Sequence, residues 1–563
     1  MSSPRPVVEA ENRLVRFNGE RDAILDQVER RVTAAYLAAA ERSPDASLEY
    51  VLNEVAYSEI RRHEAAGGSG RKALARWRDL AVRLGRMSEA EKRAELERLV
   101  AHYARDVVGN FNPRVYRFAN DVLPPALSVL FSPLSSMREG LAAFDSMARR
   151  IQVEGELEAV RAACDRGTLV VTPTHSSNMD SIVLGFALRE AMLPPVTYGA
   201  GKNLFSNPFI SFFMHNLGAY RVDRRLKFAL YKDVLKEYST VLLERGFHSL
   251  FFPGGTRNRS NRVEDHLKLG LLGTGLAAYR NSLRAGAPSR RIYVVPATIN
   301  YRLVLEAETL IEDYLEETGR SRYIIEDDEF SRLGRILEFV RKILVHEGAV
   351  VMRLGRPLDP FGNTVDDRGE SLDHRGRPVD PATYLIGEGG EIDVDPQREA
   401  VYTRQLGGEL ARLFRRETVF LTTHLAARAV FDLVIERTGQ HDIYRLLRLP
   451  PSAVSLSVEE VCRRIDRLRE RLAAAPEHGR VDARVREVDA RAVLEDALRA
   501  LTTYHARPVI EPHGERVRVG AMKLLYYYQN RTAHLAREDG RGAARDGAAA
   551  RDGASARPRE VRA

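Results

Sequence analysis

Short apolar runs alternate with segments of helical periodicity between about residues 151 and 300, and this alternation limits the possible folds more than any other feature. The run 169–171 predicts a buried strand, and 181–188 predicts a helix a few residues later. Further strands are predicted at 247–252 and 291–296, and helices at 226–245 and 267–284. Alternating strands and helices favour an α/β fold with a central, mostly parallel sheet and flanking helices.

The rest of the chain has mostly helical patterning on both sides of this region. We expect an N-terminal helical domain over 1–150, an α/β domain over 151–400 and a C-terminal helical region over 401–535. The tail 536–563 repeats Arg-Asp-Gly among alanines and predicts disorder. Residues 355–397 are rich in Gly, Pro and Asp, which predicts either an irregular excursion packed on the α/β domain or a mobile loop.

The polar stretch 172–180 joins the predicted strand to the predicted helix. It places His175 at the strand end and Asp180 at the helix start, in the pattern H-x-x-x-x-D. A carboxylate on one imidazole nitrogen fixes the tautomer, so that the other nitrogen can take a proton from a substrate. The alternative is a core histidine beside a helix-capping aspartate, and the spacing alone does not decide between the two.

Three later blocks favour the catalytic interpretation. They are Gly-Ala-Tyr-Arg-Val-Asp-Arg-Arg at 218–225, Phe-Phe-Pro-Gly-Gly-Thr-Arg-Asn-Arg-Ser at 251–260 and Val-Val-Pro-Ala-Thr-Ile-Asn-Tyr at 294–301. With His175 and Asp180, their order and spacing resemble the four blocks of the glycerolipid acyltransferases. The stretches 193–203 and 523–534 resemble the glycerol-3-phosphate and dihydroxyacetone-phosphate branch, so the resemblance covers about 150–535. One position departs, since the family usually has Glu in the third block where this chain has Gly254.

The resemblance implies a glycerol-3-phosphate O-acyltransferase that makes lysophosphatidate for phospholipid biosynthesis. The acyl group comes from acyl-CoA or acyl-carrier protein, and no cofactor or metal is expected. His175 is the expected general base and Asp180 orients it. The oxyanion would be held by amides of the Gly254–Gly255 turn or of the helix start after His175. The family's fourth block is expected to shape the acyl pocket.

A phosphate-bearing acceptor calls for arginine, whose planar fork binds phosphate oxygens in pairs. Resemblance favours Arg224 and Arg257 among the arginines of the second and third blocks, although each single arginine has a solvated surface charge as its alternative. The residues assigned to substrate binding are Arg221, Arg224, Arg225, Gly254, Gly255, Thr256, Arg257 and Arg259.

The formal net charge of +8 suits anionic partners, including phosphate groups, coenzyme A, acidic carrier proteins and anionic lipid. Basic residues are not interleaved with aromatics in the way that predicts a nucleic-acid surface. No apolar run reaches the roughly 20 residues of a spanning helix. We therefore expect a peripheral protein on the cytoplasmic face of the cell membrane. The stretches 122–137 and 203–220 could rest in the membrane interface, with core packing as the alternative.

Other functions stay open at this point. The acceptor could be dihydroxyacetone phosphate or lysophosphatidate in place of glycerol-3-phosphate. Gly254 keeps open a non-catalytic lipid-binding protein on the same fold. In a thioesterase, water would replace the alcohol.

Overall fold

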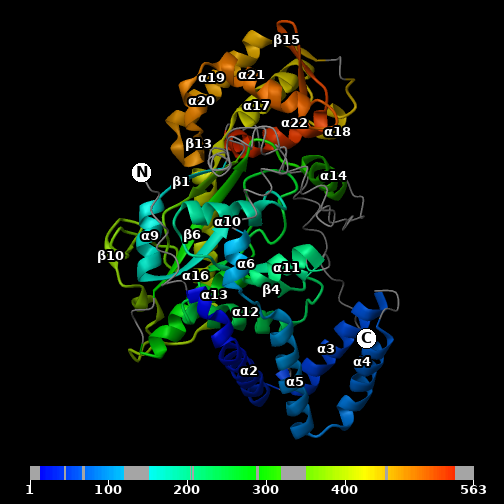
Figure 1. Cartoon of the computed structure of the whole chain (residues 1–563), viewed down its shortest axis with the longest axis vertical. Coiled ribbons are helices and arrows are strands. Elements are labelled where there is room, and N and C mark those ends of the chain that lie inside the picture. The colour runs from blue at the N-terminus through cyan, green and yellow to red at the C-terminus, as the bar shows by residue number, and fades with distance from the viewer. Residues whose placement is uncertain are drawn as a thin grey trace, which may run out of the picture.

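A seven-stranded sheet with flanking helices lies at the centre of the computed structural model, between helical N-terminal and C-terminal regions (Figure 1). The structure describes residues 13–43, 46–65, 70–119, 151–202, 205, 208–286, 291–318, 350–450 and 454–538. The strand order is β1-β7-β6-β2-β5-β3-β4. The predicted α/β fold with helical regions on both sides is confirmed.

Five neighbouring strands of this sheet run parallel, from β6 through β2, β5 and β3 to the edge strand β4. Strand β7 runs antiparallel to β6 and pairs with β1. The carboxyl ends of the five parallel strands therefore meet at one edge, where ligands bind in open α/β sheets. The bounds are β1 (Ile151–Gly155), β2 (Gly167–Pro173), β3 (Thr197–Gly201), β4 (Ala219–Val222), β5 (Ser249–Leu250), β6 (Arg291–Tyr301) and β7 (Val350–Leu354).

The helices around the sheet follow the predicted alternation. The most important is α10, because its first residue is Asp180 and it begins soon after β2 ends. These helices are α9 (Leu157–Arg166), α10 (Asp180–Glu190), α11 (Pro208–Asn216), α12 (Ala229–Glu244), α13 (Leu269–Arg284), α14 (Ala307–Thr318) and α16 (Pro396–Glu417).

The N-terminal helices pack against α12 of the central unit. Arg31 on α2 donates to Glu244 at 2.7 and 2.8 Å and to Glu237 at 3.0 Å. On α4, Trp77 is buried in the core that these helices share. A capping box of Ser88 and Glu91 opens α5. The bounds are η1 (Arg13–Arg16), α2 (Phe17–Arg42), α3 (Leu48–Ala65), α4 (Arg71–Arg83), η3 (Leu84–Arg86), α5 (Glu89–Val107) and α6 (Pro113–Arg117).

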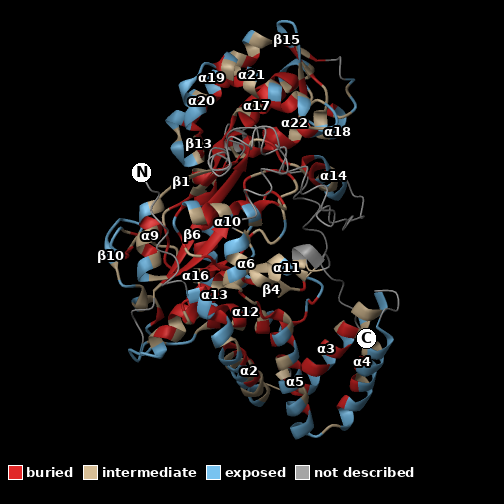
Figure 2. Ribbon diagram, in the orientation of Figure 1, coloured by how far each residue is buried: buried red, intermediate tan, exposed pale blue. Residues whose placement is uncertain are grey.

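The C-terminal helices share a hydrophobic core with the sheet. One buried cluster contains Val171 and Ile299 of the sheet together with Val430, Leu494 and Tyr528. Figure 2 shows buried residues along the sheet and on the C-terminal helices. The helices are α17 (Thr422–Thr438), α18 (Ile443–Leu446), α19 (Val458–Ala474), η9 (Pro476–His478), α20 (Ala483–Glu487), α21 (Ala490–Thr503), α22 (Met522–Gln529), η10 (Asn530–Thr532) and α23 (Ala533–Glu538). The strands are β11 (Val419–Phe420), β12 (Ser455–Ser457), β13 (Arg480–Val481), β14 (Ile510–His513) and β15 (Arg516–Val519).

The Gly-, Pro- and Asp-rich stretch 355–397 packs on the central unit, since its Leu358, Phe361 and Leu385 are buried. It contains β8 (Thr364–Val365), β9 (Ser371–Leu372), β10 (Pro378–Val379) and η7 (Pro381–Leu385). Of the two alternatives, the packed excursion is the one observed.

The membrane-related predictions have different outcomes. Within the described ranges, no helix combines the length and the apolar character needed to cross a bilayer. The stretch 122–137 lies outside the described residues. The predicted tail begins with the last three residues of α23, and 539–563 also lie outside the described residues.

Candidate active site

The imidazole of His175 lies just beyond β2 and is held by Asp180 at the start of α10. Its Nδ1 is 2.8 Å from Asp180 Oδ2, and its ring stacks on Phe252, with centroids 4.0 Å apart and planes at 21°. The Asp180 side chain is fully buried, whereas the His175 side chain is 15% exposed. Because Asp180 occupies Nδ1, Nε2 is the nitrogen left for a substrate proton.

Asp180 is held by three further hydrogen bonds. The amides of Ser176 and Ser177 donate to Oδ2 at 2.7 and 3.0 Å, and the hydroxyl of Tyr301 donates to Oδ1 at 2.6 Å. Asp180 thus binds the amides before its own helix and orients His175 at the same time. The two interpretations of the H-x-x-x-x-D pattern are therefore compatible. Sequence reasoning gave Tyr301 no role, although it ends the fourth block.

The third block forms a turn after β5 that closes over the His175 backbone. The Gly255 amide donates to the Phe252 carbonyl at 3.0 Å, and the Asn258 amide donates to the His175 carbonyl at 2.7 Å. Gly255 has φ of +78°, a conformation that favours glycine. The predicted turn therefore lies directly against the predicted base.

Gly254 faces a carboxylate that sequence reasoning missed. Glu264 Oε1 accepts the His175 amide at 2.7 Å. Burial raises the pKa of Glu264 to about 7, although the His175 amide and the Arg531 guanidinium act to lower it. An ideal Cβ on Gly254 would lie 2.9 Å from the Glu264 carboxyl carbon. Nothing in the sequence pattern distinguishes Glu264 from an ordinary surface glutamate.

The arginines of the third block have different surroundings. Arg257 Nη1 is 3.7 Å from Oε1 of the buried Glu306, whose two oxygens accept the Ser177 hydroxyl and the Asn178 amide, both at 2.9 Å. Arg259 instead faces α14, where it pairs with Glu317 at 3.0 Å. Arg257 is thus the arginine of this block placed beside the first block.

Buried carboxylates gather around this site, and burial raises the pKa of Glu306 as well. Even so, among the described residues no group of three His, Cys, Asp or Glu side chains is arranged to hold a metal ion.

The arginines of the second block lie on or after β4, the edge strand. Arg221 lies 5.2 Å from the centroid of the Phe205 ring, while Arg225 pairs with Asp223 at 3.1 Å and Arg224 is exposed. Three strand spacings separate β4 from β2, which amounts to about 14 Å. These arginines share the sheet edge with His175 but stand at its far strand.

The two predicted sources of oxyanion donors can be separated. At the helix start, the amides of Ser176 and Ser177 donate to Asp180, and that of Asn178 donates to Glu306. In the described part of the chain, the amides of Thr256 and Arg257 have no protein acceptor. The third-block turn is therefore the better candidate, and Thr256 is exposed there.

The C-terminal block also reaches the site. Asn530 Nδ2 donates to the Ser260 carbonyl at 3.0 Å, and Arg531 Nη2 donates to Asn300 Oδ1 at 2.7 Å. Arg531 is buried, which lowers its pKa to about 10 against the opposing effect of Glu264. Residues more than 200 positions apart thus build one polar cluster.

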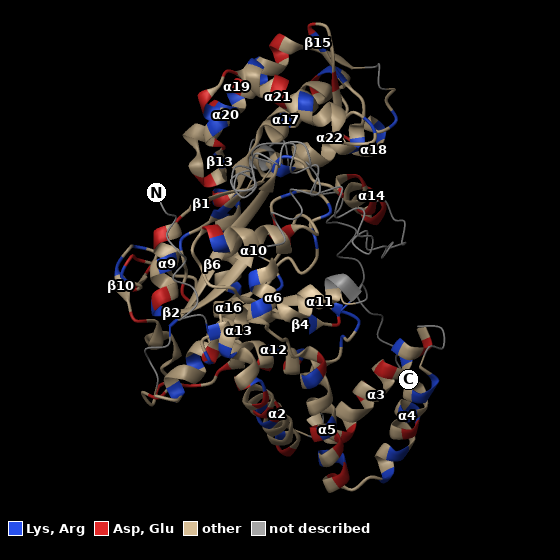
Figure 3. Cartoon of the chain, in the orientation of Figure 1, with Lys and Arg blue, Asp and Glu red and all other residues tan. Residues whose placement is uncertain are grey.

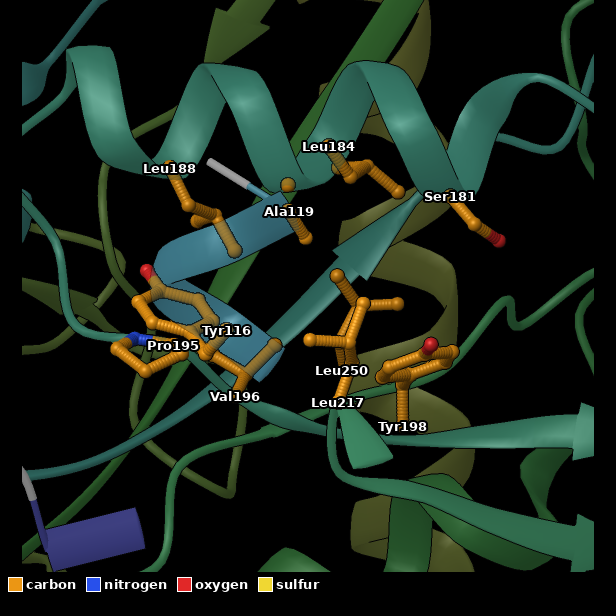
Figure 4. Close-up of a pocket in the computed structure, with 11 residues that line it drawn as sticks. Tyr116, Ala119, Ser181, Leu184, Leu188, Pro195, Val196, Tyr198, Leu217 and Leu250 are labelled. Atoms are coloured by element: carbon orange, nitrogen blue, oxygen red, sulfur yellow. The ribbon is translucent and has the colours of Figure 1, made fainter. Parts of the chain in front are cut away.

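An apolar cavity of about 110 Å³ opens beside α10 (Figure 4). Its wall includes Ser181, the residue after Asp180, and continues with Leu184 and Leu188 along the helix. The other lining residues are Tyr116, Ala119, Gly185, Pro195, Val196, Tyr198, Leu217 and Leu250. No residue of the fourth block lines this cavity, and its Val294 and Val295 are fully buried within β6.

Comparisons with known proteins match the part of the chain that contains His175, Asp180 and the third block to acyltransferases. Residues 150–300 match the family model described as Acyltransferase. A glycerol-3-phosphate acyltransferase of Pseudomonas paraeruginosa is 27% identical over 262 residues, which are 46% of this chain and 28% of that protein. One of Xanthomonas axonopodis pv. citri is 29% identical over 205 residues, which are 36% and 21% of the two chains.

The chain thus spans between 21% and 28% of the length of these two relatives. Among solved structures, a 1-acyl-sn-glycerophosphate (LPA) acyltransferase of Thermotoga maritima matches with 15% identity and a TM-score of 0.23, covering 46% of this chain and 89% of that one.

Proposed function

We propose that this protein is a glycerol-3-phosphate O-acyltransferase, because residues 150–300 match the Acyltransferase family model and similar proteins carry that name. It transfers a fatty acyl group from an acyl thioester to a hydroxyl of glycerol-3-phosphate and releases lysophosphatidate and a free thiol. The observation that carries this proposal is the His175 imidazole held by the buried Asp180, with Arg257 nearby.

The reaction proceeds by direct attack within a ternary complex. His175 Nε2 takes the proton of the acceptor hydroxyl while that oxygen attacks the thioester carbonyl carbon. Asp180 stabilises the imidazolium that forms. The negative charge on the carbonyl oxygen is stabilised by the amides of Thr256 and Arg257. When the carbon–sulfur bond breaks, the imidazolium returns its proton to the leaving thiolate.

The acceptor phosphate binds the guanidinium of Arg257. Its contact with Glu306 is long at 3.7 Å, so its donors are available for phosphate oxygens, and Glu306, which binds Ser177 and Asn178, keeps the side chain beside the first block. Arg224 and Arg221, at the far strand of the same edge, would contact the more distant parts of the donor or the membrane surface.

The acyl chain of the donor enters the apolar cavity beside α10. The cavity wall includes Ser181, Leu184 and Leu188, so a bound chain would lie along α10, the helix whose first residue holds His175 (Figure 4). Either acyl-CoA or acyl-carrier protein can present such a chain, and the positive net charge suits both.

The protein binds the cytoplasmic face of the membrane peripherally, through an apolar surface formed by α11 and by Phe118, the residue that follows α6. Helix α11 carries no charged side chain (Figure 3). Phe212 is 52% exposed and Phe118 is 46% exposed, while the Phe118 and Phe213 rings stack with centroids 6.5 Å apart. Exposed aromatics on an uncharged helix are typical of an interfacial contact.

The test is acyl transfer by the purified protein in lipid vesicles, with labelled acyl-CoA or acyl-carrier protein and each acceptor in turn. We expect glycerol-3-phosphate to be acylated, and His175→Ala to slow that acylation by about 10²- to 10⁴-fold. His266→Ala is the matched control, because this side chain is 96% exposed and pairs with its neighbour Asp265, outside the cluster around His175. Acylation of dihydroxyacetone phosphate or lysophosphatidate alone would reassign the acceptor. Release of free fatty acid would indicate a thioesterase, and inertness with every acceptor would indicate a non-catalytic lipid-binding protein.

A further inference from the structure

The space in front of Gly254 is filled by the side chain of Glu264, ten positions along the chain. An ideal Cβ on Gly254 would lie 2.9 Å from the Glu264 carboxyl carbon and closer still to Oε2. Gly254 does not have positive φ, whereas Gly255 does. The backbone at 254 therefore admits any residue, and it is Glu264 that excludes a side chain there.

Glu264 holds the backbone from which the catalytic imidazole projects. Its Oε1 accepts the His175 amide at 2.7 Å, and Asn258 of the same loop donates to the His175 carbonyl at 2.7 Å. Asp180 and Phe252 then fix the ring itself. The loop that follows β5 thus determines the position of the base, while Asp180 of the first block and Phe252 of the third determine the orientation of its ring.

The surroundings of Glu264 are unusual for a glutamate. The residue is buried, and within the described part of the chain its Oε2 has no partner at full hydrogen-bond geometry. The Arg531 guanidinium and the nearby Gly254 amide favour its negative charge, whereas burial and Asp180 oppose it. Burying a carboxylate without full hydrogen bonding costs free energy, so its presence calls for an explanation. The contacts of Glu264 with the His175 backbone and with the turn at Gly254 supply one.

The geometry points to Glu264 as a positioning residue for His175 and for the turn at 253–258. It brings a carboxylate to the third block from the far end of the loop, in the space that a side chain at 254 would otherwise use. Gly254, the one departure within the four blocks, is thereby compensated by a residue outside them. As a statement about catalysis, this inference rests on the proposed function; as a statement about packing, it does not.

The experiment moves the carboxylate from one position to the other. Glu264→Ala should lower kcat about 100-fold through misplacement of the base, with a smaller change in the KM for the acceptor. Gly254→Glu should also impair the enzyme, because two carboxyl groups would overlap. The double variant Gly254→Glu/Glu264→Ala should have a kcat at least about 10-fold higher than either single variant. Such a recovery would restore part of the 100-fold loss expected from misplacement of the base.

Two controls separate positioning from general damage. Glu264→Gln keeps an acceptor for the His175 amide and should stay within a few-fold of the native kcat. Gly255→Glu/Glu264→Ala should not recover, because φ of +78° at Gly255 disfavours a side chain. The inference is overturned if folded Glu264→Ala keeps native kcat, or if the Gly254→Glu/Glu264→Ala variant is no better than Glu264→Ala.

Thermal unfolding supplies a readout that does not depend on activity. The midpoint shift of the double variant should be smaller than the sum of the two single shifts, because each substitution relieves the defect of the other. Should the native protein acylate no acceptor, the proposed function fails, and this comparison still decides whether Glu264 occupies the space of a side chain at 254. Additive shifts would refute that.

Discussion

Replacement of Asp180 by Asn isolates the charge behind His175 from the geometry that holds it. Two backbone amides, of Ser176 and Ser177, point at Oδ2. They require an oxygen at that place, so the side-chain nitrogen of the introduced asparagine would face the Tyr301 hydroxyl, which can accept as well as donate. His175 Nδ1–H then keeps an acceptor and the imidazole keeps its tautomer.

The expected loss follows from exchanging a charged for a neutral acceptor. A hydrogen bond to a charged group contributes about 1.5–3 kcal/mol and a neutral one about 0.5–1.5 kcal/mol. The difference of about 1–2 kcal/mol corresponds to a fall in kcat of roughly 5- to 30-fold. His175→Ala should lose about 10²- to 10⁴-fold, the usual contribution of a general base. Asp180→Ala is not equivalent, because it leaves three buried donors unpaired, at about 1–3 kcal/mol each.

The assay is steady-state acyl transfer in vesicles by wild-type, Asp180→Asn, His175→Ala and His266→Ala proteins, with circular dichroism to check folding. Native turnover in Asp180→Asn would refute the role given to the charge. A loss as deep as that of His175→Ala would refute the orientation of the amide, since the side-chain nitrogen would then face Nδ1.

Four further predictions concern the acceptor, the donor, pH and the membrane. Arg257→Ala should raise the KM for glycerol-3-phosphate by about 10- to 150-fold, the value of one charged hydrogen bond, whereas Arg259→Ala, which breaks a pair with α14, should change it far less. Gly185→Leu adds a side chain to the wall of the cavity in Figure 4, at a helical position with nothing within 4 Å of its Cβ, and should shift donor preference in competition assays toward shorter acyl chains. Because the pKa of Glu264 is raised from 4.5 to about 7, its stabilising contribution is complete below pH 4.5 and is lost as the pH rises through 7. The free energy of unfolding of Glu264→Gln in urea, minus that of wild type, should therefore rise by up to about 3 kcal/mol between pH 5 and pH 8. Phe212→Asp should reduce flotation with anionic vesicles at high salt, where charge attraction is screened and apolar contacts remain; unchanged flotation would exclude α11 from the membrane contact.

Much of this fold could be predicted because the spacing of apolar residues, and the residues that end helices and strands, agree with the structure. The helix predicted over 267–284 corresponds to α13, Leu269–Arg284, and the run 169–171 lies inside β2. The strands β3 and β4 escaped prediction because they are short and carry Gly, Ala or Arg in place of a branched apolar run. Pairing with neighbours, which no local pattern encodes, makes them strands.

The candidate site likewise contains residues that local spacing predicts and residues that only tertiary packing brings together. His175 and Asp180 are five positions apart, so local spacing was enough to predict their pairing. Glu264 and Arg531 act on the site through tertiary packing, and their residue types are common on any surface. Such partners become visible only when burial and hydrogen bonding are known.

The contact between the C-terminal block and the third-block loop has a consequence for the smallest unit that can work. The stretch that matches the acyltransferase family stops at residue 300, one position before Tyr301, and it also excludes Glu306 and Arg531. A fragment cut at that boundary would keep its histidine and aspartate but lose the hydroxyl that orients the aspartate. It would also expose the apolar face that α17 and α22 cover. In a library of truncations, catalytic competence should therefore be lost together with the C-terminal helices rather than at the edge of the recognisable domain.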